Sequence, residues 1–336
     1  MIQRRLEVSA EKHRLAAPFR IAGYVFEDVD AVVATITDGA AQGRGEAAGV
    51  YYLGDDLDHM LAEIEDARSA IEGGTGRDAL RQLMPPGGGR NALDCALWEL
   101  EAAQSGEPAW RLAGIDAPRP LVTTFTLGAE DPEVMAGAAR AYAAARAIKL
   151  KLTGELALDL ARVAAVRAAR PDVWLGVDAN QGYRRDGLER LVAALLGQKV
   201  SLLEQPLARG DEAALDGYRS PIPIAADESA LGFADLAGLV GRFDVVNIKL
   251  DKCGGLTEAL AMAGEARRLG LGVMVGNMVG TSLAMAPAYI LGQLCDYVDL
   301  DGPTFLVEDR LPGIVYRGGE IVCGEEVWGG SGRLAA

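Results

Sequence analysis

The stretch AIKLKLTGELALDLARVAAVRAARPDVWLGVDA, residues 147–179, contains a short β-type run, a helical run rich in Ala and Leu, and a second β-type run. A strand, a helix and a strand in this order form a parallel pair with the helix outside the sheet. The alternation runs from residue 123 onward, with strand candidates TTFTLG, AIKLKL, VWLGVDA, VSLLEQP, PIAADE, DVVNIKL, GVMVGN and YVDLDG. Eight such units predict an α/β fold with a closed (β/α)8-type barrel, and no GxGxxG follows the first strand to support a dinucleotide-binding sheet.

The segment before this repeat has a different pattern. RRLEVSA and DAVVATITDG alternate like strands and are expected to form a meander, with PFRIAGYVFED between them as a loop. Residues 56–84 and 91–105 are expected to be helices, the second with Asn91 as its N-cap. The Pro-rich run APRP at 117–120 marks a boundary.

Three regions are therefore expected. They are an α+β capping domain over 1–116 whose loops in the 20s and 50s close the site, a parallel barrel over 117–310 that carries the catalytic residues, and a C-terminal segment over 311–336 that returns to the capping domain.

Composition excludes several classes of protein. The 336-residue chain has 33 Lys and Arg against 48 Asp and Glu, a net charge of −15 that argues against nucleic acid or an anionic membrane as partner. Only two histidines, His13 and His59, are present, which argues against histidine triads and His-rich zinc sites. The four cysteines have no CxxC spacing, and no run resembles a signal peptide or a membrane span. A cytoplasmic location is expected.

Charged residues stand inside the predicted strands, where an unpaired buried charge would be costly. Near the C-terminal end of a barrel strand such a side chain can point into the barrel mouth, where this fold keeps its active sites. Alternation places the members of each of these sets on one face of their strand: Lys149 and Lys151; Asn247, Lys249 and Asp251; Asp299 and Asp301.

Three acids end three consecutive strands. Asp178, Glu204 and Asp227 follow Lys151 and precede Lys249, with successive intervals of 27, 26, 23 and 22 residues. One barrel unit is about 25 residues, so these five side chains are expected around one rim. Converging carboxylates repel one another unless a cation neutralises them, and oxygen ligands alone indicate Mg²⁺, with Mn²⁺ as the alternative.

The two flanking lysines suit proton transfer. A substrate carboxylate on the metal would place its α-carbon between Lys151 and Lys249. One amine can then remove the α-proton while the other returns a proton to the opposite face, through an ene-diolate.

The motifs KxK (149–151), DxN (178–180), ExP (204–206), DES (227–229) and NIKLDKCGGL (247–256) resemble those of the enolase superfamily, in its muconate-lactonizing-enzyme subgroup. DLDGPTF at 299–305 resembles the DxD signature of dipeptide epimerases, including L-Ala-D/L-Glu epimerases. The resemblance extends into the N-terminal region at GRNALDCALWEL, residues 89–100.

The resemblance implies Mg²⁺-dependent epimerisation of a dipeptide at the α-carbon of its C-terminal residue. It implies Asp178, Glu204 and Asp227 as metal ligands and Lys151 and Lys249 as the acid/base pair. Lys149 would assist at the substrate carboxylate, and Asp299 and Asp301 would hold the free ammonium. Further candidates beside the substrate are Arg20, Tyr24, Thr126 and Met278; those beside the metal ligands are Asn180, Glu228 and Asn247. The partner expected is a small dipeptide, and a homo-oligomer is possible.

One position departs from the family pattern. Ala-Glu epimerases tend to carry an Arg a few residues beyond PF, whereas residues 23–26 are GYVF and the nearby arginine is Arg20. The aromatic residues Tyr24, Phe26, Tyr51 and Tyr52 suit a bulkier or less acidic second residue, and packing between domains is the other interpretation of them.

Alternatives remain within and beyond the superfamily. N-acylamino-acid racemase, o-succinylbenzoate synthase and cycloisomerase share the barrel chemistry, but none needs two carboxylates aimed at an ammonium. A metal-free Schiff-base lyase using Lys249 as nucleophile is a different class of enzyme, and a catalytically silent barrel is a third hypothesis.

Overall fold

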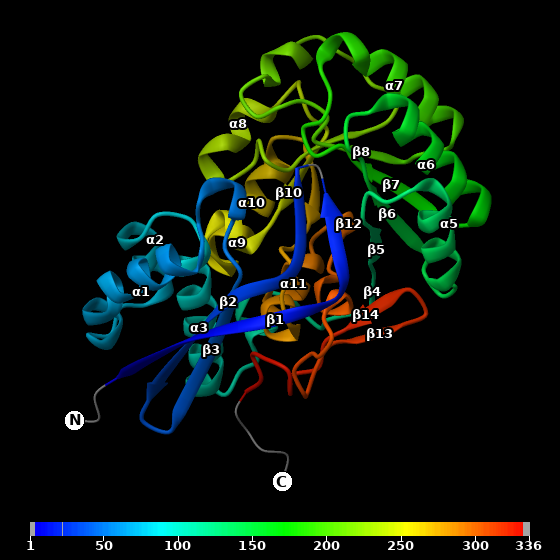
Figure 1. Ribbon diagram of the computed structural model, residues 1–336. Helices are drawn as coiled ribbons and strands as arrows, with labels where there is room; N and C mark the ends of the chain where they lie inside the picture. The colour runs from blue at the N-terminus through cyan, green and yellow to red at the C-terminus, as the bar shows by residue number, and fades with distance from the viewer. Residues whose placement is uncertain (1–3, 22, 332–336) are drawn as a thin grey trace.

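Eight parallel strands surround the centre of the larger part of the molecule. The computed structural model describes residues 4–21 and 23–331 (Figure 1). In the order β12-β11-β10-β9-β8-β7-β6-β5, neighbouring strands are hydrogen-bonded. Their bounds are β5 (Thr124–Leu127), β6 (Ala147–Lys151), β7 (Trp174–Asp178), β8 (Leu202–Glu204), β9 (Ile224–Ala226), β10 (Val245–Ile248), β11 (Gly272–Val275) and β12 (Tyr297–Val298). The predicted fold class and all eight strand candidates are confirmed.

Helices cover the outside of this sheet. They are α5 (Pro132–Ala141), α6 (Leu156–Ala169), α7 (Arg185–Gly197), α8 (Leu236–Leu239), α9 (Leu250–Cys253), α10 (Leu256–Arg268) and α11 (Ser282–Gly292), with short 3₁₀ turns η2 (Glu212–Leu215), η3 (Phe233–Asp235) and η4 (Gly302–Phe305). The strands are buried along their length because helices cover one face and facing strands fill the other. None of the described helices is long and apolar enough to cross a membrane.

Side chains join the first and last barrel strands. β5 and β12 are the two ends of the hydrogen-bonded strand order. The hydroxyl of Thr123 accepts a hydrogen bond from the backbone nitrogen of Leu300 at 2.9 Å, and the backbone nitrogen of Thr126 donates to Asp301 Oδ2 at 2.6 Å. The barrel seam between β5 and β12 is therefore closed by Thr and Asp side chains.

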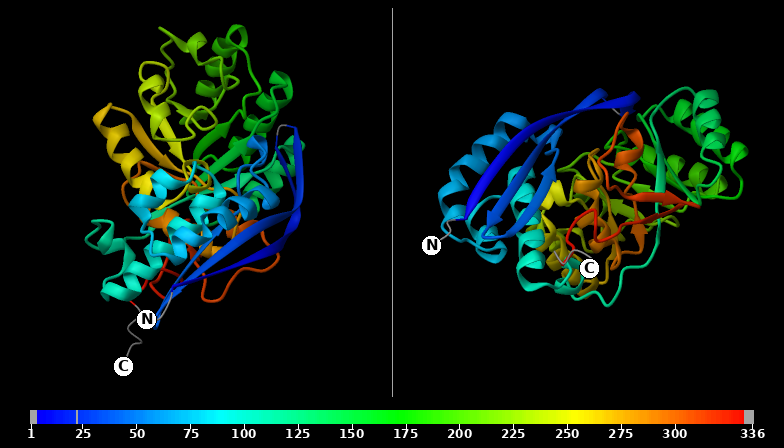
Figure 2. Two further views of the ribbon diagram at one scale, coloured as in Figure 1. Left: turned by 90° about the vertical axis from the view of Figure 1, so that its left-hand side faces the viewer. Right: turned by 90° about the horizontal axis from the view of Figure 1, so that it is seen from below.

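The N-terminal cap consists of a three-stranded antiparallel sheet and helices. Its elements are β1 (Arg5–Ile21), β2 (Tyr24–Asp38), β3 (Ala41–Ala47), η1 (Tyr51–Leu53), α1 (Leu57–Glu72), α2 (Arg77–Leu83), α3 (Gly88–Ser105) and α4 (Ala109–Leu112). The β1–β2 hairpin runs from the cap helices to the mouth of the barrel (Figures 1 and 2). At its tip the carbonyl of Arg20 accepts a hydrogen bond from Ala129, just after β5.

The expected loop PFRIAGYVFED is wrong: these residues form the end of the hairpin, apart from Ala22, which lies outside the described residues. Phe19 pairs with Phe26 across the two strands, after a shift in register that follows Arg14. Aromatic cross-strand pairs stabilise a ladder, and the Phe19 ring also lies 4.7 Å from that of Phe305 on the barrel side, so the segment is held extended.

The helix boundaries in the cap also differ from the expectation. The helix expected over 56–84 divides into α1 and α2 after Gly73. α3 begins at Gly88, so Asn91 is an interior residue and not the N-cap. A Cβ at Gly88 would lie 2.4 Å from Met60 Sδ and 2.8 Å from Gly49 Cα, and only glycine lets the first turn pack there.

The C-terminal segment contacts both parts of the molecule. β13 (Val315–Arg317) and β14 (Glu320–Val322) form a small sheet with β4 (Leu121–Val122). Beyond it, Trp328 Nε1 donates to the carbonyl of Arg44 at 2.8 Å, in the cap. The domain limits at 116/117 and 310/311 stay predictions.

Candidate active site

Three buried carboxylates meet at the C-terminal ends of β7, β8 and β9. The strand register pairs Lys151 with Asp178 and Asp178 with Glu204, which places them at one level of the barrel. Asp227 follows β9, and one oxygen from each of the three acids lies within 4.8 Å of the others. All three residues are at most 2% exposed. Burial and the neighbouring Asp178 raise the pKa of Glu204 to about 8, as expected for carboxylates that converge in a buried site.

The donor atoms around these acids fit a hard divalent cation. Asn180 Oδ1, Asn247 Oδ1 and Glu228 Oε2 are buried and accept no hydrogen bond from the described residues. Buried oxygen acceptors without a donor are what oxygen-liganded metals, or the waters that they hold, require. Asn247 Nδ2 donates to Glu204 Oε1 at 2.8 Å, and the backbone nitrogen of Asn180 donates to Asp178 Oδ1 at 2.9 Å. Asn180 and Asn247 thus contact the predicted metal ligands, and Glu228 directly follows Asp227 in the chain.

The two proposed acid/base lysines lie on either side of the acids. Lys151 Nζ, on β6, is 2.6 Å from Asp178 Oδ2. Lys249 Nζ, directly after β10, is 2.6 Å from Asp227 Oδ2. Burial alone would lower the pKa of Lys249, but Asp227 and Glu204 raise it well above its ordinary value. Lys149 Nζ reaches across the barrel to Glu204 Oε2 at 2.9 Å.

A second lysine that follows β10, Lys252, was not singled out by the sequence. β10 ends at Ile248, and α9 follows at once, so Lys252 lies one helical turn after Lys249. Its fully buried ammonium donates to the carbonyl of Asp227 at 2.6 Å and also to the Asp227 carboxylate. The spacing of three residues would have indicated it only if the strand end had been known.

The same helix corrects the expectation for Asp251. Because Asp251 lies in α9, it does not share a strand face with Asn247 and Lys249. Its Oδ1 instead accepts hydrogen bonds from the backbone nitrogens of Ala48, at 3.0 Å, and Gly49, at 3.2 Å, in the cap.

Gln205 was also missed. Its side chain is completely buried, and its Oε1 accepts from the backbone nitrogens of Asp227, at 2.9 Å, and Ser229, at 3.2 Å. Its Nε2 donates to the carbonyl of Leu207 at 2.9 Å. Its φ of 34° is in the left-handed region, where a residue without special contacts would be strained. A glutamine between an acid and a proline carried no signal of this role.

Asp299 and Asp301 follow β12 directly and are not part of the strand. Both are buried and contact Thr126: its hydroxyl donates to Asp299 Oδ1 at 3.3 Å, and its backbone nitrogen donates to Asp301. Lys149 Nζ lies 2.7 Å from Asp299 Oδ2. Burial would raise the pKa of Asp299, but Lys149 lowers it, whereas burial and the charge of Asp299 raise the pKa of Asp301 to about 7. Of the two acids, Asp301 is thus the one whose negative charge is less balanced by a neighbouring cation.

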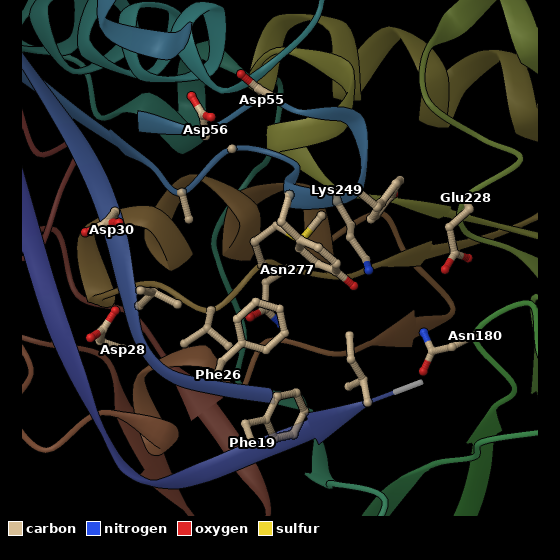
Figure 3. Close-up of a pocket in the computed structure, with 18 of the residues that line it drawn as sticks. Phe19, Phe26, Asp28, Asp30, Asp55, Asp56, Asn180, Glu228, Lys249 and Asn277 are labelled. Atoms are coloured by element: carbon tan, nitrogen blue, oxygen red, sulfur yellow. The ribbon is translucent and has the colours of Figure 1, made fainter. Parts of the chain in front are cut away.

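A cavity of about 260 Å³ lies between the acids and the cap. Lys151, Lys249 and Met278 line it from the barrel, and Phe26 and Tyr51 line it from the cap. Figure 3 shows Lys249 and Phe26 on the two sides of this space. Of the other predicted substrate contacts, Thr126 holds the two aspartates. Neither Arg20 nor Tyr24 lines the cavity: the Arg20 guanidinium is 2.8 Å from Glu130, and the 45%-exposed Tyr24 packs on Tyr51.

A sequence model of the family "Enolase C-terminal domain-like" matches residues 133–305. The chain is 39% identical to the L-Ala-D/L-Glu epimerase of Escherichia coli (strain K12) over 320 residues, 95% of this chain and 99% of that one. It is 41% identical to the N-acetyl-D-glutamate racemase of Pseudoalteromonas sp. over 75% of this chain and 79% of that one.

Solved structures of similar proteins belong to the same family. An enolase family member from Agrobacterium tumefaciens with homology to dipeptide epimerases, bound to sodium and L-Ala-L-Glu, has a TM-score of 0.93 and 42% identity over 97% of this chain and 100% of that one. The dipeptide epimerase of Enterococcus faecalis V583, complexed with Mg and L-Leu-L-Tyr, has a TM-score of 0.91 and 29% identity over 99% of each chain.

The chain belongs to the enolase superfamily. Within it, the protein is a member of the dipeptide epimerase family, and it is an isomerase of the racemase and epimerase type. The predicted resemblance and class of enzyme are confirmed.

Proposed function

We propose that the protein is a Mg²⁺-dependent epimerase that inverts the α-carbon of the C-terminal residue of a dipeptide. The observation that carries the proposal is the position of two lysines on either side of three converging carboxylates, Lys151 beside Asp178 and Lys249 beside Asp227. Inversion of one carbon needs a proton acceptor on one face and a proton donor on the other, and a single base serves poorly for both.

The acids would hold the metal and the lysines would move the proton. Asp178, Glu204 and Asp227 would bind Mg²⁺, which when bound supplies the positive charge that stabilises a substrate carboxylate as its α-proton leaves. The amine of Lys151 or Lys249 would take that proton, and the ammonium of the other would donate one to the opposite face. Lys149 would place a further positive charge near the same carboxylate.

The amino end of the substrate would bind at the barrel seam. Asp299 and Asp301 are buried next to each other, with the Lys149 ammonium near the first of them only. The free ammonium of a dipeptide would be a second cation and would balance the negative charge of Asp301. Thr126, which donates hydrogen bonds to both acids, carries no charge that could do so.

Deuterium incorporation tests this function. The Mg²⁺-loaded enzyme in D₂O is given a set of L-Ala-L-Xaa dipeptides and, in parallel, the corresponding N-acetyl amino acids, with mass spectrometry of each substrate. Incorporation into dipeptides at a kcat/KM far above that of the N-acetyl compounds supports the proposal. The reverse order would establish an N-acylamino-acid racemase instead.

The cytoplasmic location and the homo-oligomer stay predictions. Light scattering on the purified protein across a concentration range would measure the number of subunits.

A further inference from the structure

The active-site cavity extends from the catalytic lysines into the cap. In Figure 3, Lys249, Asn180 and Glu228 lie at one end of it, and Asp28 and Asp30 lie at the other. Asp299 and Asp301 are not among the described residues that line this space. In a dipeptide bound as proposed above, the ammonium and the side chain of the epimerised residue would therefore point in different directions, and that side chain would enter the cavity.

Part of the cavity wall is apolar. The hairpin supplies Phe19, Ile21 and Phe26, and the segment after β11 supplies Met278 and Val279. The rings of Phe26 and Tyr51 pack edge to face, with centroids 5.1 Å apart, and form a continuous aromatic wall. An aliphatic or aromatic side chain that enters this space exchanges water for such contacts, which is favourable.

The cavity offers no spare cation. Among the described residues that line it, the only lysines or arginines are Lys151 and Lys249, which act at the α-carbon in the proposed mechanism. Arg20 is the arginine nearest in sequence to the hairpin tip, and its guanidinium is 2.8 Å from Glu130.

The charges farther from the lysines are mostly negative. Asp28 and Asp30 share one exposed ammonium, that of Lys12, at 3.1 Å from each. Asp55 also lines the cavity, and it already accepts hydrogen bonds from the His59 ring and the backbone of Gly88. A carboxylate on the substrate side chain would thus be desolvated without a cationic partner among the described lining residues, and with these acids beyond it.

We infer that the substrates are dipeptides with an apolar second residue, and that this cavity discriminates against Glu and Asp at that position. The inference rests on the proposed function and names the substrate class of the same site. It separates this chain from the two relatives whose names specify glutamate and from the Agrobacterium tumefaciens protein whose structure contains L-Ala-L-Glu.

Paired substrates test the side chain independently of the amino end. L-Ala-L-Leu and L-Ala-L-Met should have a kcat/KM at least 100-fold above that of L-Ala-L-Glu, measured as deuterium incorporation in D₂O. An L-Ala-L-Glu value equal to or above theirs would overturn the inference and leave the dipeptide function standing. If only N-acetyl amino acids react, the dipeptide function fails, and N-acetyl-L-leucine against N-acetyl-L-glutamate then decides the side-chain preference.

A single added cation tests the location. Ile21→Arg introduces a guanidinium into the part of the cavity wall that the hairpin supplies, and Ile21→Met is the uncharged control of similar length. The arginine variant should raise the ratio of L-Ala-L-Glu to L-Ala-L-Leu turnover at least tenfold, and the methionine variant should not. An unchanged ratio in the arginine variant, or an equal change in both, would show that the substrate side chain does not bind here.

Discussion

The carboxylate of Asp251 lies 3.2 Å from the backbone nitrogen of Gly49, so a helix of the barrel that follows Lys249 directly is bonded to the cap loop that leads to Tyr51 and Tyr52. Ala48 donates to the same oxygen, so this acid satisfies two backbone groups at once. The position of the cavity wall is thereby tied to the segment that carries Lys249.

Loss of this contact should affect binding more than chemistry. Asp251→Ala leaves two backbone N–H groups without their acceptor, and it should lower the free energy of unfolding by about 1–3 kcal/mol and raise KM several-fold. Asp251→Asn keeps one acceptor oxygen and should change both quantities less. Urea unfolding and steady-state kinetics measure them; a large fall in kcat with KM unchanged would contradict this role.

Each of the three proposed metal ligands should be essential for activity. Asp178→Asn, Glu204→Gln and Asp227→Asn each remove one negative charge at constant shape, so Mg²⁺ affinity and turnover should both fall, turnover by about 100-fold or more. Calorimetric titration with Mg²⁺ and activity after EDTA treatment check the two effects. A variant with normal Mg²⁺ affinity would remove that residue from the ligand set.

The two lysines should be separable by isotope exchange. Lys151→Ala and Lys249→Ala should each abolish epimerisation, since general acid–base catalysis typically contributes about 10²- to 10⁴-fold. Each variant should still exchange the α-proton of one epimer only, with opposite preference. Equal exchange from both epimers in either variant would contradict the placement of one lysine on each face.

The amine of the substrate should be recognised by charge. N-acetylation of a good dipeptide should lower kcat/KM by about 10²-fold, because a buried charge-assisted contact is lost while the acid remains. Asp301→Asn should cause a similar loss toward the free dipeptide and little further loss toward the acetylated one. Equal turnover of free and acetylated dipeptides would favour the racemase alternative.

Asp94, which is not part of the proposed active site, should make the free energy of unfolding depend on pH. Its carboxylate accepts from the hydroxyl of Thr257 at 2.6 Å, and burial raises its pKa to about 6. Since the unfolded value is near 3.9, the folded state binds more protons between the two values, and its stability falls as the pH rises from about 4 to about 6.

The Asp94 contribution is of the order of 3 kcal/mol, from about two pKa units. The Asp94→Asn variant lacks this titration, so the difference in unfolding free energy between wild type and variant should fall over this pH range. Urea unfolding at pH 4, 5, 6 and 7 measures the difference, and parallel curves for the two proteins would contradict the assignment.

The barrel could be predicted from sequence because its pattern is local and repeated. A strand with a terminal charge recurs once per βα unit, so the sequence predicts Lys151, Asp178 and Glu204 on one rim, and the strand register confirms that they lie at one level. The residue at which a strand ends is harder to predict. Nothing in NIKLDK, residues 247–252, indicates that the strand stops and that a helix begins directly after Lys249.

The cap could be predicted less well, because its structure depends on contacts distant in sequence. The hairpin tip is extended because Phe19 packs on Phe305 and Arg20 bonds to Ala129. The early start of α3 depends on the close approach of Gly88 to Gly49 and Met60. Gln205 acts through its amide on the backbone of another strand end, which no local pattern indicates.

The closed seam between β5 and β12 limits how this enzyme can change specificity. Asp301 would bind the substrate amine, and it also accepts a hydrogen bond from the backbone nitrogen of Thr126. A substitution that removes its carboxylate would therefore weaken amine binding and also remove a hydrogen bond that closes the barrel between β5 and β12. A substitution at 301 that keeps a hydrogen-bond acceptor, such as Asn, should therefore disturb the seam less than Ala or Leu, which would leave the Thr126 N–H without its acceptor at a cost of about 1–3 kcal/mol. The hydrogen bonding of the barrel thus restricts the substitutions at residue 301 by which the substrate specificity could change.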